Sequence, residues 1–336
     1  MLWYMKSSYS KKTFILIPSI FVLGLFLLWI GTGMYLETTA PIETTAPIET
    51  TAPIEPLQTT KNLMHTSITV EEILDYTFSS HTVEMHDLSD TFRVYFTEED
   101  AKRYEQFGAN VDWEDGGKLV FDDKFGDEYQ YLTPHPNTVV IFPLFTAAAY
   151  NEPGFYTFFR GECDETCIND VSFEYPSIDT ASSFMTTQLL YDLGYEIITD
   201  IDVDLNPGIL KKYDTIILLH NEYVTKKMFD AISTHPNIIY LFPNALYAEI
   251  TVDYDKNTMT LIRGHNYPEF EIRNGFDYSI EEKFHEYEYD YECLNWEFIQ
   301  FENGYALNCY PDNVIPAELY ILRAIKDISS NFHNGL

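Results

Sequence analysis

The sequence has few positively charged residues. Its 336 residues include 20 lysines and arginines against 53 aspartates and glutamates, which gives a formal net charge of -33 at pH 7. Contacts with the phosphates of nucleic acids require a positively charged face, so this composition argues against nucleic-acid binding. We expect the acidic groups to form a solvated surface that keeps the protein soluble, with dedicated cation binding as the alternative.

Several short motifs that carry enzymatic chemistry are also missing. The chain has no G-x-S-x-G, no G-x-x-x-x-G-K-[ST], no H-E-x-x-H and no G-x-G-x-x-G after a strand. These absences argue against common serine hydrolases, P-loop nucleotide enzymes, zinc metalloproteases and dinucleotide-binding enzymes. A calcium loop of the EF-hand type and an N-x-[ST] glycosylation sequon are missing as well.

Residues 13–36 contain no charged side chain. As a helix these 24 residues would span about 36 Å, which exceeds the ~30 Å hydrocarbon core of a bilayer. Lys6, Lys11 and Lys12 precede the segment, so the positive-inside rule places residues 1–12 in the cytoplasm and the remainder of the chain outside the cell. We therefore predict a single-pass protein of the cell membrane, anchored by residues 13–36. A cleaved signal peptide is the alternative, although its apolar region would be unusually long.

Residues 38–55 repeat the sequence TTAPIE three times. The prolines hold such a chain extended, and the segment has no large apolar residue other than isoleucine with which to build a core. We predict that residues 37–60 form a stalk, whose repeats would reach about 56 Å in the polyproline conformation. The threonines of the repeats are candidates for O-linked sugar.

The rest of the chain divides into two parts by its pattern. Residues 61–136 mix short helical and strand patterns, and we interpret them as an N-terminal segment of the exported domain. Residues 137–330 alternate buried strands with amphipathic helices, which predicts a parallel sheet with helices on both faces, followed by antiparallel hairpins. The expected strands are 139–145, 195–199, 215–219 and 238–242, the expected helices are 178–193, 206–213 and one after Thr225, and the expected hairpins pair 249–254 with 258–263 and 293–301 with 305–310.

The four cysteines form an even number in a domain that we place outside the cell, which favours disulfides. Of the three possible pairings we favour Cys163 with Cys167 and Cys293 with Cys309, because the members of each pair are close along one element. A zinc site with four thiolates is the alternative, but the spacing of the cysteines is unusual for such a site.

The segment Thr215 to Thr225, TIILLHNEYVT, is the clearest candidate for part of a functional site. A buried strand runs directly into polar residues here, and open α/β sheets bind their ligands at the carboxyl ends of their strands. Other expected strands also end in polar residues, which a parallel sheet would bring to the same edge. We predict catalytic roles for His220 and Glu222, a neighbouring role for Tyr150, and a ligand-contacting rim formed by Asn221, Tyr223, Asn244 and Tyr247.

These side chains also have ordinary structural interpretations. A tyrosine such as Tyr150 is common at the edge of a core with its hydroxyl satisfied. His220 is explained equally as a hydrogen-bonded residue at a strand end, and Glu222 as an acidic residue near the positive end of the next helix.

Four segments, taken in order, carry a resemblance to a known family. They are FPLFTAAAYN at 142–151, VSFEYP at 171–176, the stretch 189–225 that ends in LLHNEYVT, and YLFPNALY at 240–247. Over about residues 138–250 the chain resembles the α/β domain of the N,N-dimethylformamidase large-subunit family, which is similar in fold to the class I glutamine amidotransferases. The exported region also looks like membrane-anchored archaeal proteins. The resemblance implies a flavodoxin-like or amidotransferase-like sheet.

The dimethylformamidase resemblance implies an amidohydrolase site with one iron held by two tyrosines and a glutamate. The A-Y-N motif would supply Tyr150, the H-x-E-Y motif would supply Glu222, and VSFEYP would supply Tyr175 as the second tyrosine. The E-Y-P order at Tyr175 departs from the acidic-Arg-Pro-Tyr order that the family leads us to expect. Class I amidotransferase chemistry is not expected, because its nucleophilic cysteine belongs after a central strand and no cysteine lies there.

Two functional hypotheses follow. The one that we favour is a membrane-anchored extracellular α/β domain that binds a ligand or is catalytically degenerate. The alternative is a metal-dependent amidohydrolase with iron at Tyr150, Tyr175 and Glu222. Candidate partners are a small ligand, a cation or a neighbouring envelope protein, bound at the strand ends or at the acidic aromatic tract of residues 281–292, whose simpler interpretation is a solvated edge or loop.

Overall fold

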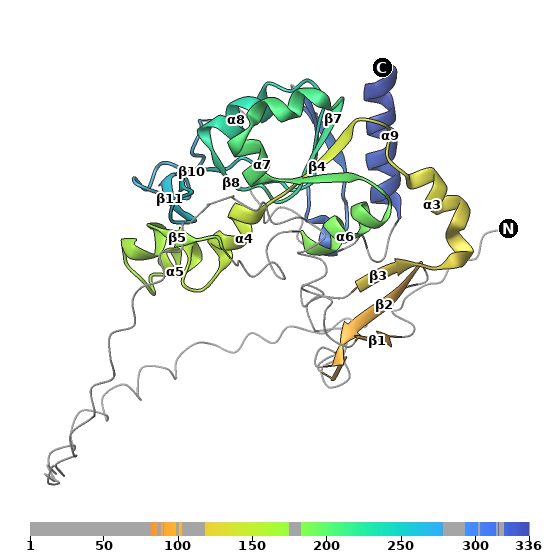
Figure 1. The fold of residues 1–336 in the computed structure, drawn as a ribbon, viewed down its shortest axis with the longest axis horizontal. Helices are drawn as coiled ribbons and strands as arrows, with labels where there is room; N and C mark the ends of the chain where they lie inside the picture. Colours follow the sequence, from red (N-terminus) through yellow and green to blue (C-terminus); the bar gives the residue numbers. More distant parts are fainter. Residues whose placement is uncertain are drawn as a thin grey trace, which may run out of the picture. The chain divides into compact units, whose positions relative to one another are not determined.

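The computed structural model describes residues 82–85, 89, 91–98, 101–102, 118–174, 183–277, 293–301, 303–313, 315 and 319–335 (Figure 1). All of them belong to one compact unit, residues 64–336. No helix within these ranges is long and apolar enough to cross a membrane. The predicted membrane helix at 13–36 and the predicted stalk at 37–60 lie outside the described residues, and both stay predictions.

Within the described ranges, the largest sheet has six strands, of which five are parallel. Its order is β12-β13-β9-β7-β4-β6, and β12 pairs with β13 in the antiparallel direction. The strands are β4 (Thr138–Phe142), β6 (Glu196–Thr199), β7 (Thr215–Leu218), β9 (Ile238–Tyr240), β12 (Phe298–Phe301) and β13 (Gly304–Leu307).

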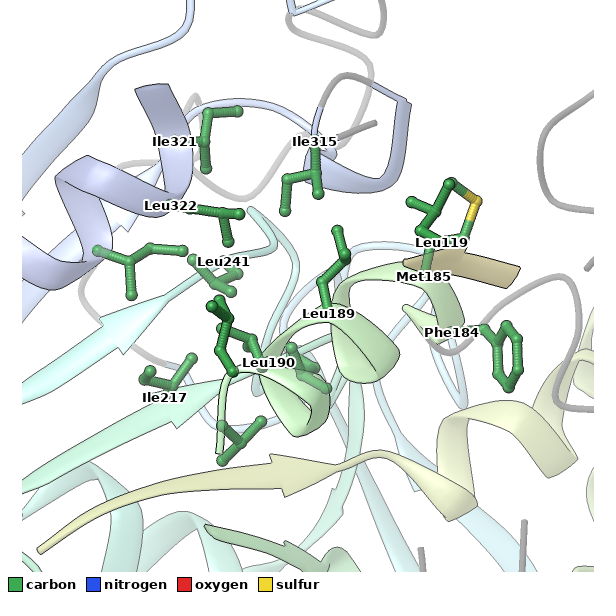
Figure 2. Packing of buried hydrophobic residues seen from close by; sticks show 14 of the residues in the cluster. Leu119, Phe184, Met185, Leu189, Leu190, Ile217, Leu241, Ile315, Ile321 and Leu322 are labelled. Carbon is green, nitrogen blue, oxygen red and sulfur yellow. The ribbon is translucent and has the colours of Figure 1, made fainter. Parts of the chain in front are cut away.

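The parallel strands are apolar on both faces because helices cover both faces. Alternate residues of each strand belong to two separate cores: Val140 and Ile217 lie in one, and Val139 and Ile216 in the other. In the first core, α6 (Phe184–Asp192) and α9 (Tyr320–Asn334) pack on the sheet, and Figure 2 shows Leu189 and Leu190 of α6 in the same cluster as Ile217. In the second core the sheet packs against α7 (Asp200–Leu205) and α8 (Lys226–Ser233).

A second sheet adjoins the second core and has the order β5-β11-β10-β8. Its strand β8 begins at Tyr223, directly after the polar residues that follow β7, and pairs in parallel with β10. The chain therefore passes from the large sheet into the second sheet through the segment His220 to Glu222. The strands are β5 (Val171–Ser172), β8 (Tyr223–Thr225), β10 (Ala248–Asp253) and β11 (Thr258–Arg263).

A small antiparallel sheet, β1-β2-β3, packs on the first core. The buried side chain of Gln188 on α6 accepts a hydrogen bond from the backbone N–H of Leu119 and donates one to its carbonyl, which satisfies an edge of β3. The elements not yet named are β1 (Thr82–Met85), β2 (Phe92–Thr97), β3 (Lys118–Phe121), α3 (Gly126–Leu132), α4 (Leu144–Tyr150), α5 (Phe155–Phe159), and the 3-10 helices η2 (Asp123–Phe125), η3 (Glu165–Ile168), η4 (Pro207–Lys212) and η6 (Pro311–Asn313).

The predicted α/β class, with parallel and antiparallel sheets and helices, is confirmed. One predicted strand is too long: the run expected at 139–145 ends at Phe142, because Pro143 interrupts it and α4 begins at Leu144. The helix expected at 206–213 is a 3-10 helix, and α7, which the pattern did not predict, precedes it. Both predicted hairpins are present, although β13 of the second also joins the large sheet beside β9.

Both predicted disulfides are confirmed. Cys163 is bonded to Cys167, and Cys293 is bonded to Cys309, so all four cysteines of the chain are paired. A four-thiolate zinc site is excluded by this pairing. The second disulfide lies in the first core and joins the segments on either side of the β12–β13 hairpin.

Candidate site at the carboxyl ends of β4 and β7

The neighbouring strands β4 and β7 mark the point where the sheet changes direction. The chain moves outward from β4 to β6 on one side and then continues at β7 on the other side. Open α/β sheets bind ligands in the crevice outside the carboxyl ends of two such strands. Tyr150 ends α4, which follows β4, and Glu222 follows β7, so the topology brings both residues to this position.

Glu222 is fully buried, and each of its carboxylate oxygens has two polar neighbours. Oε2 accepts a hydrogen bond from Tyr150 Oη at 3.1 Å and lies 3.3 Å from Nε2 of His220. Oε1 lies 2.5 Å from Nε2 of His265 and accepts a hydrogen bond from Tyr156 Oη at 3.3 Å. The hydroxyls of Tyr150 and Tyr156 are themselves 2.8 Å apart. Glu222 is therefore the centre of a cluster of two tyrosines and two histidines.

The backbone of this segment is held from two directions. The hydroxyl of Thr146 on α4 accepts hydrogen bonds from the N–H groups of Glu222 (3.0 Å) and Tyr223 (3.3 Å). On the other side, the carbonyl of Glu222 accepts from the N–H groups of Tyr247 and Ala248, at 3.0 and 2.9 Å. Glu222 thus stands between α4 and the start of the second sheet, and its backbone polar groups are satisfied without water.

The ring of His220 is enclosed by aromatic side chains. It stacks on Phe242 with 4.8 Å between ring centroids, and the rings of Tyr150 and Tyr310 lie at 5.6 and 5.8 Å. Its backbone N–H donates to Ser183 Oγ at 3.0 Å. This packing leaves the side chain 6% exposed and directs its Nε2 toward Glu222.

Electrostatics favour an ionised Glu222 and a neutral Tyr150. Burial raises the pKa of a carboxyl group, but the charge of His265 and the hydrogen bonds from His220 and His265 outweigh it and lower the pKa of Glu222 to about 2. Burial, followed by the nearby Glu222 carboxylate, raises the pKa of Tyr150 well above its ordinary value. Tyr150 in this arrangement keeps its proton and donates it in the hydrogen bond to Glu222.

The structure brings Tyr150, His220 and Glu222 together, as the sequence predicted. Asn221, Tyr223 and Asn244 are buried, whereas Tyr247 is half-buried, and the rings of Tyr223 and Tyr247 lie 5.5 and 4.6 Å from the ring of His265. Among the residues that the structure describes, the side-chain amides of Asn221 and Asn244 have no hydrogen-bond partner. Tyr175, the predicted second tyrosine, and the acidic aromatic tract at 281–292 lie outside the described residues.

Sequence reasoning missed two members of the cluster, Tyr156 and His265. Tyr156 lies on the short helix α5, six residues after Tyr150, and His265 follows β11 of the second sheet. The only available signal for His265 was its place just after the second strand of a predicted hairpin. That signal could not be used, because the sequence does not show that this hairpin packs beside Glu222.

The donor atoms of the cluster suit a hard cation. The two phenol oxygens lie 2.8 Å apart, and each lies within 3.3 Å of one oxygen of the Glu222 carboxylate: Tyr150 of Oε2 and Tyr156 of Oε1. Oxygen donors of this kind are preferred by ions such as ferric iron. The described part of the chain has no group of three His, Cys, Asp or Glu side chains arranged to hold a metal ion. A cation at this position would therefore depend on the tyrosine oxygens together with Glu222.

The fold and the site together define a class of protein: an α/β domain with a buried cluster of tyrosines, histidines and a carboxylate. The cluster lies at the topological switch point of the parallel sheet, between β4 and β7. Residues 119–279 match the family described as N,N-dimethylformamidase beta subunit-like, C-terminal, and the chain is similar to that family over this stretch. The match includes all five residues of the cluster: Tyr150, Tyr156, His220, Glu222 and His265. No curated protein matches the chain. The predicted resemblance is confirmed at this level, while the likeness to the large subunit and to membrane-anchored archaeal proteins stays a prediction.

Proposed function

We propose that the domain is a metal-dependent amidohydrolase whose cation is held by Tyr150, Tyr156 and Glu222. The observation that carries the proposal is the convergence of these three oxygen-bearing side chains, with contacts of 2.8, 3.1 and 3.3 Å, at the ligand-binding end of the sheet. The similarity to the dimethylformamidase-like family over residues 119–279 supports amide hydrolysis as the reaction. The order of the parallel strands also supports a flavodoxin-like or amidotransferase-like fold.

Tyr156 takes the role that the sequence analysis gave to Tyr175. Its hydroxyl already lies 2.8 Å from Tyr150 Oη and 3.3 Å from Glu222 Oε1. Tyr175 is the alternative second ligand. Substituting Tyr156 and Tyr175 one at a time tests which of them binds the cation.

The residues around the cation would each have a defined task. A hard cation, when bound, would polarise an amide carbonyl and lower the pKa of a bound water. His220 and His265 hold the carboxylate of Glu222 from its two sides, at 3.3 and 2.5 Å. The aromatic rings around His220 exclude bulk water from the cluster, which strengthens the electrostatic interactions within it.

A second candidate function is binding without turnover. Its support is the burial of Glu222 and the contact of both its carboxylate oxygens with side chains of the protein. On this alternative the domain would bind a cation, a small ligand or an envelope protein and would carry a degenerate hydrolase site.

The test is metal analysis of the purified full chain. The proposal expects stoichiometric iron and a tyrosinate-to-iron absorption band, both lost in Tyr150→Phe, Tyr156→Phe and Glu222→Gln. Tyr175→Phe examines the alternative ligand, and Tyr305→Phe, which changes a tyrosine packed on Phe332 of α9, is the matched control. A well-folded protein that binds no metal would overturn the proposal, and iron binding without hydrolysis of small formamides would favour the binding role.

We also propose that residues 13–36 anchor the domain to the cell membrane with residues 1–12 in the cytoplasm and the domain outside. The lysines before residue 13 support this topology, and two disulfides agree with an oxidising compartment. Protease added to intact cells should cut the TTAPIE stalk and release the domain. Full protection of the chain would contradict the exterior location.

A further inference from the structure

His265 reaches Glu222 from a different sheet than the other members of the cluster. Tyr150, Tyr156 and His220 belong to segments that follow β4 and β7, whereas His265 lies in the turn after β11. Its Nε2 is 2.5 Å from Glu222 Oε1, and its side chain is 12% exposed. The cluster is therefore completed only when the second sheet packs against the end of the large one.

The turn that carries His265 is fixed by its backbone. Gly264 has φ +122°, and a Cβ there would lie 2.9 Å from the side chain of Ala248, so the position requires glycine. The N–H of Gly264 donates to the carbonyl of Tyr267, and the N–H of His265 donates to the carbonyl of Arg273 at 2.8 Å. His265 itself has φ +51°, a conformation that most residues avoid and that the surrounding contacts hold here.

The imidazole of His265 is fixed by neighbouring rings. The ring centroids of Tyr247, Phe159 and Tyr223 lie 4.6, 5.4 and 5.5 Å from its own. These rings come from three separate segments and leave the imidazole little freedom to rotate away from Glu222. Both the backbone and the side chain of His265 are therefore fixed by contacts within the protein.

We propose that His265 is a positioning residue, which holds Oε1 of Glu222 and thereby keeps Oε2 directed at Tyr150. A carboxylate with one oxygen held by a fixed donor cannot rotate freely about its last bond, so its second oxygen stays within hydrogen-bond reach of Tyr150. Hydrogen bonds of this kind orient metal-binding carboxylates and raise the affinity of the site. The effect on a cation rests on the proposed function, whereas the hydrogen bond to Glu222 does not.

The experiment uses the purified full chain and three variants. His265→Phe keeps a ring among the aromatic neighbours but removes the donor, and His265→Gln restores a donor of similar reach. His135→Phe is the matched control, since His135 is also half-buried but precedes β4 at the opposite end of the sheet, where its Nε2 contacts Ser330. One readout is the downfield imidazole N–H proton resonance in protein labelled with 15N-histidine. The other is the dissociation constant for ferric iron, followed by tyrosinate-to-iron absorption.

The proposal expects the downfield resonance in the wild type and in His135→Phe and its loss in His265→Phe. Iron binding should weaken about 10- to 100-fold in His265→Phe and recover in large part in His265→Gln. Unchanged iron affinity in His265→Phe, or a wild type without the resonance, would overturn the proposal. A wild type that shows the resonance but binds no iron would refute the cation site while supporting the role of His265 in holding Glu222.

Discussion

Glu222 is an ionised carboxylate with no exposed surface, in a protein whose other described acidic side chains mostly lie at its surface. Removing a charge from water costs several kcal/mol unless hydrogen bonds and opposite charge replace the lost hydration. Four neighbours provide that replacement: Tyr150 and His220 at one oxygen, Tyr156 and His265 at the other. The arrangement is costly to assemble for stability alone, which is a physical reason to regard it as a functional site.

The stability of the protein should depend on the ionisation of Glu222. Its pKa is lowered from 4.5 to about 2 on folding, so the stabilisation that its charge provides is present above about pH 4.5 and is lost as the pH falls toward 2. The difference in unfolding free energy between the wild type and Glu222→Gln should therefore shrink by about 3 kcal/mol across this interval. Denaturant unfolding of both proteins at a series of pH values measures this difference in unfolding free energy.

The control for this pH series is Glu249→Gln, which changes a partly exposed glutamate on β10. This variant separates the general effect of removing a carboxylate from the effect of removing the buried one. A difference between the wild type and Glu222→Gln that stays constant across the interval would show that Glu222 is not held ionised by the histidines.

Thr146 should stabilise the site through its hydroxyl group. In Thr146→Val the N–H groups of Glu222 and Tyr223 lose a buried acceptor, which should cost about 1–3 kcal/mol of unfolding free energy. Thr146→Ser keeps the acceptor and removes only a buried methyl group, at about 1 kcal/mol. Equal losses in chemical denaturation of the two variants would refute this role for the hydroxyl.

At the scale of elements, polar side chains that accept hydrogen bonds from the first N–H groups of helices hold the helices around the site in place. The N–H of Phe145, in the first turn of α4, donates to Oδ2 of buried Asp200 at 2.8 Å, so the residue after β6 caps the helix that carries Thr146 and Tyr150. Asp312 accepts from the N–H of Thr186 at the start of α6 in the same way. Thr225, three residues after Glu222, caps α8.

The pairing of β13 with β9 should depend on Gly304. A Cβ at this position would lie 1.8 Å from the carbonyl oxygen of Ile238, its partner in the parallel register, so Gly304→Ala should force the strands apart and cost about 1–3 kcal/mol or more. Gly126→Ala is the control, because nothing lies within 4 Å and the backbone is already helical there. The control should be neutral or stabilised by up to about 1 kcal/mol. Thermal or denaturant unfolding compares the two, and a stable Gly304→Ala would contradict the register.

The predictions of helices and strands were right where the local pattern of apolar residues reflects burial. They were wrong where tertiary packing determines the type or the end of an element. Strands β7 and β9 are short apolar runs between turn signals, and their burial follows from their composition alone. The end of β4 was misplaced because residues 144 and 145 are as apolar as the strand before them. They belong to a helix because Asp200, from a neighbouring strand end, accepts its first N–H groups.

At the scale of the whole molecule, the cluster lies where two sheets meet. The segment His220 to Glu222 leaves the large sheet, and β8 enters the second sheet immediately after it. Three of the partners of Glu222 lie in segments that follow strands of the large sheet. The fourth, His265, follows β11 of the second sheet. Mutual packing of the sheets therefore determines whether the site exists at all.

The two disulfides should contribute unequally to the stability of the whole domain. Cys293 and Cys309 are separated by 16 residues and are buried in the first core, so replacing both by alanine should cost about 3 kcal/mol from loop entropy. Cys163 and Cys167 are separated by only 4 residues, and their double replacement should cost about 2 kcal/mol. Unfolding under oxidising conditions measures both, and a larger loss for the shorter loop would contradict this order.

The sequence by itself determined the class of fold, the two cysteine pairings and the strand ends where polar residues gather, because these depend on burial, periodicity and short-range spacing. It also brought Tyr150, His220 and Glu222 to one edge, since parallel strands align their carboxyl ends. Only the tertiary structure decided that Tyr156 and His265 complete the cluster. Their contacts with Glu222 span 66 and 43 residues of sequence and depend on how α5 and the second sheet pack, which no local pattern encodes.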